Sequence, residues 1–152
     1  MTQYAYQQDA YMVGTTHGSG PRRSLTLTAA VDLPIGSAVK RDVNDRRKVV
    51  LWTNTGAYAN VRIAGFVGRN AEVFSDYQEN EYNVKAGQNA LVWQEETISL
   101  IVGVDVKGGE LAYCDAVTGV PTNIAAGNGT PIGSFKTDGT AGSTILIILN
   151  IL

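Results

Sequence analysis

The side chains that could do acid–base chemistry lie in an acidic stretch, 75–82, and in the pair Glu95–Glu96. Paired carboxylates hydrolyse glycosides when a rigid frame holds them apart across a cleft. Both segments are more simply interpreted as polar loops between strands. Asp76, Glu79 and Glu81 could offer oxygens to a calcium ion, but the central glycine and terminal glutamate of an EF-hand loop are absent. We therefore predict no catalytic site and no metal site.

The sequence lacks the residues needed for nucleophilic catalysis or for a zinc site. His17 is the sole histidine, and it lies in a glycine-rich segment where nothing fixes its geometry. Cys114 is the sole cysteine, so it cannot form a disulfide within the chain, and it is interpreted as a small buried residue of a strand. Glycine pairs at 65–68 and 127–129 lack the lysine of a phosphate-binding loop, so we expect turns at both and predict no cofactor.

Charge and hydropathy argue against nucleic acid and membranes as partners. The chain has 12 basic and 14 acidic residues, a net charge of -2, and so no global positive field to attract a phosphate backbone. The most apolar run, 144–152, is far shorter than the roughly 20 residues of a membrane-spanning helix. The N-terminus has neither the basic region nor the apolar core of a secretory signal, so we expect synthesis in a cytoplasm.

Short strands separated by turns must position any site in this chain. From Ser24 to Val31, apolar and threonine side chains alternate, which is typical of a half-buried strand. Glycine, asparagine, aspartate or proline separates nearly all of the runs of this kind, and no convincing helix interrupts them. The predicted strands are 24–31, 37–40, 48–53, 59–66, 71–74, 89–93, 97–105, 110–114, 131–136 and 144–152. The pattern predicts an all-β fold, as a single small β-barrel or a jelly-roll-like sandwich.

An apolar-x-x-Gly turn that leads into a strand occurs three times, in 33–39, 84–92 and 106–113. The glycines of these turns, Gly36, Gly87 and Gly109, are expected to adopt positive φ. The uneven spacing indicates reuse of one turn within a single domain, because solenoids and propellers repeat at a fixed period.

Residues 1–23 are predicted to form an extended N-terminal arm that precedes a β-domain at 24–152. Tyr4, Tyr6 and Tyr11 are spaced along this polar segment, which ends in a glycine-rich string and the basic pair Arg22–Arg23. Aromatic rings bring a large contact area at modest entropic cost, so the arm suits docking onto another protein surface. The alternative is a frayed terminus.

A second candidate contact is the basic loop 41–48, which contains Arg46 and Arg47. Acidic residues are interleaved with the basic ones, so a solvated hairpin loop is the simpler interpretation. If it makes a contact, an acidic neighbouring subunit would be the partner, and the charges would set orientation more than affinity.

The second half of the chain carries an ordered set of turn glycines and aliphatic strands: Ile101-Val-Gly-Val104, 107–115, Gly119-Val-Pro-Thr, Pro131-Ile-Gly133 and the aliphatic C-terminal run. This order, over 84–152 with a fainter echo at 33–39, resembles the cement, or decoration, proteins of tailed phages. The resemblance implies a small β-barrel or jelly-roll-like module that is not an enzyme. It also implies that the protein lies on the outer surface of the virion capsid, bound to the major capsid protein after shell expansion.

The resemblance implies self-association as a homodimer or homotrimer. The strand predicted at 144–152 is apolar on both faces, and such a strand must be covered on both sides or pair within an oligomer. Two rival functions stay open. A head-fibre or carbohydrate-recognition module would stack sugars on Trp52, Trp93 or Tyr58, although core packing is the simpler role for the tryptophans. An enzyme would need carboxylates that converge at a subunit interface.

Overall fold

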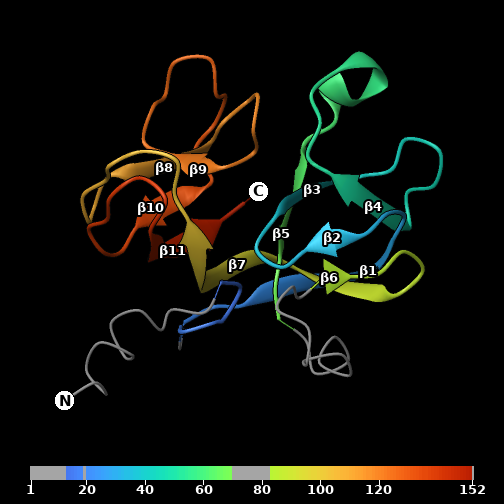
Figure 1. The fold of residues 1–152 in the computed structure, drawn as a ribbon, viewed down its shortest axis with the longest axis horizontal. Coiled ribbons are helices and arrows are strands. Elements are labelled where there is room, and N and C mark those ends of the chain that lie inside the picture. Colours follow the sequence, from blue (N-terminus) through green and yellow to red (C-terminus); the bar gives the residue numbers. More distant parts are fainter. Residues whose placement is uncertain (1–12, 19, 70–82, 152) are drawn as a thin grey trace.

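The computed structural model describes residues 13–18, 20–69 and 83–151, and the regular secondary structure of these residues is almost entirely β-strand (Figure 1). The strands are β1 (Arg23–Ala29), β2 (Leu33–Pro34), β3 (Ala38–Arg41), β4 (Lys48–Leu51), β5 (Ile63–Val67), β6 (Asn83–Val84), β7 (Asn89–Ile101), β8 (Leu111–Cys114), β9 (Pro121–Thr122), β10 (Gly133–Phe135) and β11 (Thr144–Asn150). A short 3-10 helix, η1 (Gly56–Asn60), is the one helical element within those ranges. The predicted all-β fold is confirmed.

Five strands close into a barrel, so the barrel is the architecture that this chain adopts. The order is β1-β4-β3-β5-β7, and β7 returns to pair with β1. The closure depends on a parallel pairing of β1 with β4, in which Thr28 is opposite Lys48. Short aliphatic side chains fill the barrel, as expected for a small one. They are Ala29, Leu33, Val39, Val49, Ala64, Val67, Val84, Ala90 and Val92.

Strand β7 is long enough to serve two sheets. Its N-terminal half pairs with β1 and β5 in the barrel, whereas its C-terminal half pairs with β11 along seven residue pairs. From β11 the sheet continues through β10 and β8 to β9. Figure 1 therefore shows two lobes joined by β7: a barrel lobe with β1 to β6, and a C-terminal lobe with β8 to β11.

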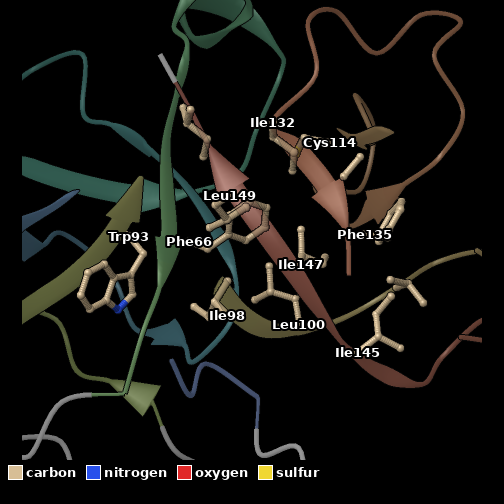
Figure 2. Close-up of a cluster of buried hydrophobic side chains, with 14 of the residues drawn as sticks. Phe66, Trp93, Ile98, Leu100, Cys114, Ile132, Phe135, Ile145, Ile147 and Leu149 are labelled. Carbon is tan, nitrogen blue, oxygen red and sulfur yellow. The ribbon is translucent and has the colours of Figure 1, made fainter. Parts of the chain in front are cut away.

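A second hydrophobic core contains residues from both lobes (Figure 2). Phe66 enters it from β5, Ile98 and Leu100 from β7, and Ile147 and Leu149 from β11. Because both lobes contribute to one core, they pack as one folded unit.

Several predicted strand boundaries are wrong. The segments 89–93 and 97–101 belong to one strand, β7, which ends before the predicted residue 105. Glu95–Glu96 lies inside β7 instead of in a loop, because both residues pair with β11. The strand predicted at 59–66 begins only at Ile63, since η1 occupies the preceding residues. The strand predicted at 71–74 and the acidic stretch 75–82 lie outside the described residues.

The glycine predictions have a mixed outcome. Gly36, Gly87 and Gly109 have φ of 85°, 91° and 92°, so the repeated turn is confirmed. At 65–68 the expected turn is wrong, because Gly65 lies within β5. Glycine is required there because the backbones of β5 and β7 approach each other closely: a Cβ at Gly65 would meet the carbonyl oxygen of Trp93 on β7.

Both edges of strand β11 form backbone hydrogen bonds with other strands of the same chain. The strand pairs with β7 on one side and with β10 on the other. One face carries buried Ile145, Ile147 and Leu149, but on the other face Ile148 is 42% exposed. The edges of this strand therefore do not require an oligomer, and only the exposed face still favours one.

Candidate interaction surface

The described root of the predicted arm lies against the chain's own barrel. The Gly14 amide donates to the Ser99 carbonyl oxygen at 2.7 Å, and the His17 amide donates to the Thr97 carbonyl oxygen at 2.8 Å. Thr16 forms an antiparallel bridge with Ile98. Since β1 pairs with the preceding part of β7, the segment 13–18 continues the same edge of that strand. Backbone hydrogen bonds thus hold His17, contrary to the sequence expectation.

Arg22 is held by a side-chain cluster on β7. Its guanidinium forms an ion pair with Glu96, whose side chain is only 1% exposed, and lies 4.9 Å from the centre of the Trp93 ring. Glu96 also accepts a hydrogen bond from the Thr97 amide at 2.9 Å. The buried carboxylate therefore has charged and polar partners, as a stable fold requires.

Arg23, at the start of β1, also contacts its own chain. Its side chain donates to the Gln94 side-chain oxygen at 3.2 Å and to the Ile151 carbonyl oxygen. These contacts and those of Arg22 link the end of the arm to β7 and to the C-terminal segment. Both arginines were predicted as interface residues, and the structure shows them as anchors of the arm root.

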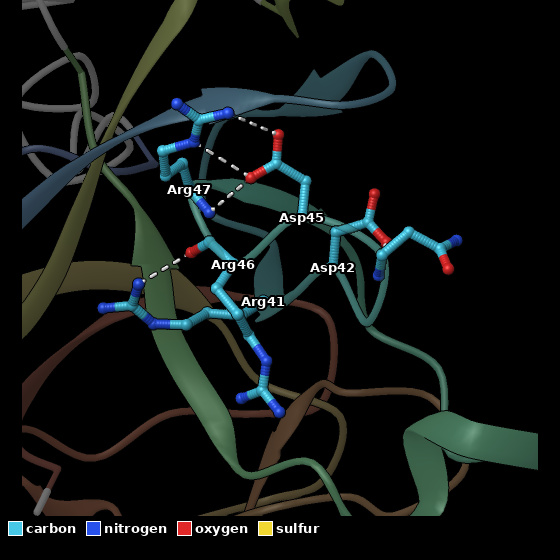
Figure 3. A network of polar contacts seen from close by, with 6 residues as sticks. Arg41, Asp42, Asp45, Arg46 and Arg47 are labelled. Carbon is cyan, nitrogen blue, oxygen red and sulfur yellow. Dashed lines mark hydrogen bonds and ion pairs between the residues drawn. The ribbon is translucent and has the colours of Figure 1, made fainter.

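Arg46 and Arg47 lie at the tip of the β3–β4 hairpin, where both side chains are exposed (Figure 3). The Arg46 carbonyl oxygen accepts a hydrogen bond from Arg41 at 2.8 Å. Arg47, 90% exposed at its side chain, pairs with Asp45 at 3.2 Å. Hydrogen bonds from the Arg47 side chain and amide hold the pKa of Asp45 below its ordinary value. The hairpin thus presents cationic groups on a locally ordered turn. Tyr4, Tyr6 and Tyr11 lie outside the described residues.

The described aromatic rings of the carbohydrate hypothesis are engaged within the protein. Trp93 is 7% exposed and belongs to the core between the lobes. Trp52 donates from its indole nitrogen to the Ala116 carbonyl oxygen at 3.2 Å, and the Tyr58 hydroxyl donates to Asp42 at 3.1 Å. Trp52 thereby ties the barrel lobe to the C-terminal lobe, which agrees with the packing role preferred from the sequence.

A buried lysine beside Trp52 was not recognised from the sequence. Lys40 is 1% exposed, and its ammonium donates to the Asn54 side chain at 3.0 Å and to the Tyr58 carbonyl oxygen at 2.9 Å. The ammonium lies 4.3 Å from the centre of the Trp52 ring. Burial lowers the pKa of Lys40. The alternation of β3 was the available signal, because it places Lys40 on the same face as buried Ala38.

Between the lobes lies a cleft of about 840 Å³, which we call the inter-lobe cleft. Its barrel side includes Lys40, Trp52 and Arg62, and its other side includes Leu111 and Ile148. Strand alternation could not reveal this cleft, because its two walls come from segments far apart in the sequence.

The described residues offer little for catalysis. They contain no group of three or more histidine, cysteine, aspartate or glutamate side chains that could hold a metal ion. Cys114 is buried as predicted, and burial raises the pKa of its thiol to about 12, which disfavours the nucleophilic thiolate. Within the described part of the chain, no helix is both long and apolar enough to cross a membrane.

Comparison with known proteins shows to which protein family this chain belongs. The model of one protein family, described as "Structural cement protein (E217 gp24/Pam3 gp6)", matches residues 1–150. The chain belongs to this phage cement protein family. It is accordingly a structural protein of the phage head, and the virion capsid is its location. The resemblance stated from the order of glycines and aliphatic strands is confirmed.

Solved structures share the fold of this cement protein. One, entitled "The capsid of Myoviridae Phage XM1", aligns with a TM-score of 0.66 at 15% identity over 91% of this chain and 89% of that chain. Another, the head fibre gp8.5 N base of bacteriophage phi29, aligns with a TM-score of 0.51 at 16% identity over 86% and 95%. At such identities the likeness establishes the fold alone. No curated protein matches the sequence.

Proposed function

We propose that this protein binds the outer surface of the phage head, bridges neighbouring major capsid subunits and thereby stabilises the expanded shell. The family match over residues 1–150 carries the proposal. A ligand that binds the assembled state in preference to the free subunits stabilises that state by mass action. Repetition of the contact over a symmetric shell multiplies the effect, because bridged subunits are held at high effective concentration.

The exposed hairpin tip is the described surface best suited to an electrostatic contact. Arg46 and Arg47 project from it, and among the described residues Asp45 is the ion-pair partner of Arg47. Rim charges of this kind accelerate association and are screened by salt. The tyrosines of the arm, Tyr4, Tyr6 and Tyr11, would add apolar contact area on a neighbouring subunit. Arg22 and Arg23 would act indirectly, by fixing where the arm leaves the barrel.

Binding to expanded shells of the major capsid protein tests the proposal. Wild-type protein should co-sediment with the shells, and replacing Tyr4, Tyr6 and Tyr11 by serine should weaken binding. Arg47→Glu should weaken it further and reduce its salt dependence. Lys136→Glu, an exposed charge reversal after β10 in the C-terminal lobe, should bind like wild type. Wild-type protein that fails to bind the shells would refute the cement function.

Self-association as a homodimer or homotrimer completes the proposal. Val117 and Ile124 support it, since they are aliphatic side chains left in solvent, 87% and 50% exposed, and lie outside the inter-lobe cleft. Light scattering of the free protein should give the mass of two or three chains. A single-chain mass at micromolar concentration would contradict this part.

A head-fibre role is the second candidate, favoured by the fold shared with the phi29 head fibre base. Copy number in purified virions separates the two roles. A ratio to the major capsid protein near one, or a simple fraction of it, fits a cement; a handful of copies fits a fibre.

A further inference from the structure

Neither Arg46 nor Arg47 of the hairpin tip lines the inter-lobe cleft, which meets the arm root at Ile151, the acceptor of the Arg23 hydrogen bond. The cleft has the size and shape of a binding groove, since its volume of about 840 Å³ falls within the range of ligand sites in proteins. Its walls come from both lobes. The lining residues that determine what it can bind are Lys40, Trp52, Arg62, Leu111, Ser134 and Ile148.

The C-terminal wall exposes aliphatic side chains in a row. Ser134 on β10 is opposite both Leu111 on β8 and Ile148 on β11, so the three residues lie side by side across the sheet. Leu111 is 54% exposed and Ile148 is 42% exposed. An occupant of the cleft would therefore cover apolar surface that now faces water.

The barrel wall is cationic. Lys40 is opposite Ile63 in the β3–β5 ladder, and Arg62 immediately precedes β5; both residues line the cleft. No aspartate or glutamate is among the described residues that line the cleft. No described carboxylate lies within ion-pair distance of Lys40, whose ammonium contacts two neutral oxygens and the Trp52 ring. An ammonium has three donors, and a buried cation is stabilised by an anionic partner.

We propose that the inter-lobe cleft receives an extended segment of a shell subunit, with aliphatic side chains against Leu111 and Ile148 and one carboxylate against the exposed Arg62, near the buried Lys40 ammonium. Charge complementarity selects this occupant, because the described lining carries two cations and no anion. The inference rests on the proposed function and specifies its partner. A protein segment fits better than a sugar, since the aromatic ring in the cleft, Trp52, is committed to Ala116 and Lys40.

Charge and polarity variants at the cleft test the inference in the shell-binding assay. Leu111→Glu and Ile148→Glu should each weaken binding at least about tenfold, because they place a charge where aliphatic contact is expected. Arg62→Glu should weaken it by repelling the carboxylate. Val31→Glu is the matched control, since Val31 is also 42% exposed but lies outside the cleft, and it should bind like wild type. Denaturation curves would verify that each variant is folded.

Photo-crosslinking identifies the occupant directly. Leu111→p-benzoylphenylalanine, bound to shells and irradiated, should crosslink to a shell-subunit segment that contains aspartate or glutamate. A crosslink only to another copy of this protein, or none despite binding, would overturn the inference while leaving the cement function intact. Wild-type binding by Leu111→Glu and by Ile148→Glu would overturn it in the same way. Absence of wild-type binding to shells would instead remove the proposed function, and the inference with it.

Discussion

At the scale of single residues, Glu96 is the buried charge that holds the arm root in place. Arg22→Ala removes its ion-pair partner and the cation above Trp93. We expect the free energy of unfolding to fall by about 1–3 kcal/mol, less than for a fully buried pair because Arg22 is half exposed. Guanidinium denaturation measures it, with Arg46→Ala as an exposed control that should change by less than about 0.5 kcal/mol. Equal stabilities of the two variants would contradict the role of Arg22.

Cys114 gives a second prediction at this scale. A pKa of about 12, raised by burial from 9.0, lowers the thiolate fraction near neutral pH by roughly 1,000-fold. Alkylation by iodoacetamide at about pH 8 should therefore be at least about 100-fold slower in the folded protein than in denaturant. Mass spectrometry of samples taken at timed intervals measures the alkylation rate. Rapid labelling of the native protein would show that the thiol is accessible.

At the scale of elements, the arm root behaves as an extension of β1 along β7. Deleting residues 1–23 removes the backbone hydrogen bonds from Gly14 and His17 and the contacts of Arg22 and Arg23. The domain should stay folded but lose about 2–4 kcal/mol of unfolding free energy. Urea denaturation of the truncated protein checks this. Unchanged stability would mean that the contacts with β7 contribute nothing to the fold.

Alternation and turn glycines predict much of the strand structure, because both are local. The run 24–31 corresponds to β1, and 144–152 to β11. The break expected at Glu95–Glu96 failed for a non-local reason: Glu96 is tolerated inside β7 because Arg22, far away in the sequence, supplies the compensating charge. The start of β5 was missed because η1 uses residues that are compatible with a strand.

At the scale of the whole molecule, closure of the barrel and the cleft between the lobes were beyond local patterns. Closure depends on the parallel β1–β4 pairing, and the division into lobes depends on β7 serving two sheets. No local sequence pattern indicates which distant strands pair with each other. The arginines were found by residue type, but the assignment of Arg22 and Arg23 to the arm root required their partners on β7 and in the C-terminal segment.

The same architecture suits a clamp. A closed barrel that shares a core with a second sheet resists deformation, and each lobe can contact a different part of the shell. A protein that bridges neighbouring subunits must hold several weak contacts in fixed positions relative to one another.

The most direct test of this function is the temperature at which expanded shells of the major capsid protein fall apart, measured by light scattering with and without saturating amounts of this protein. The proposed function predicts a higher disruption temperature for the decorated shells, with an intermediate value when Tyr4, Tyr6 and Tyr11 are replaced by serine. Shells that bind the wild-type protein to saturation yet fall apart at the temperature of bare shells would contradict it.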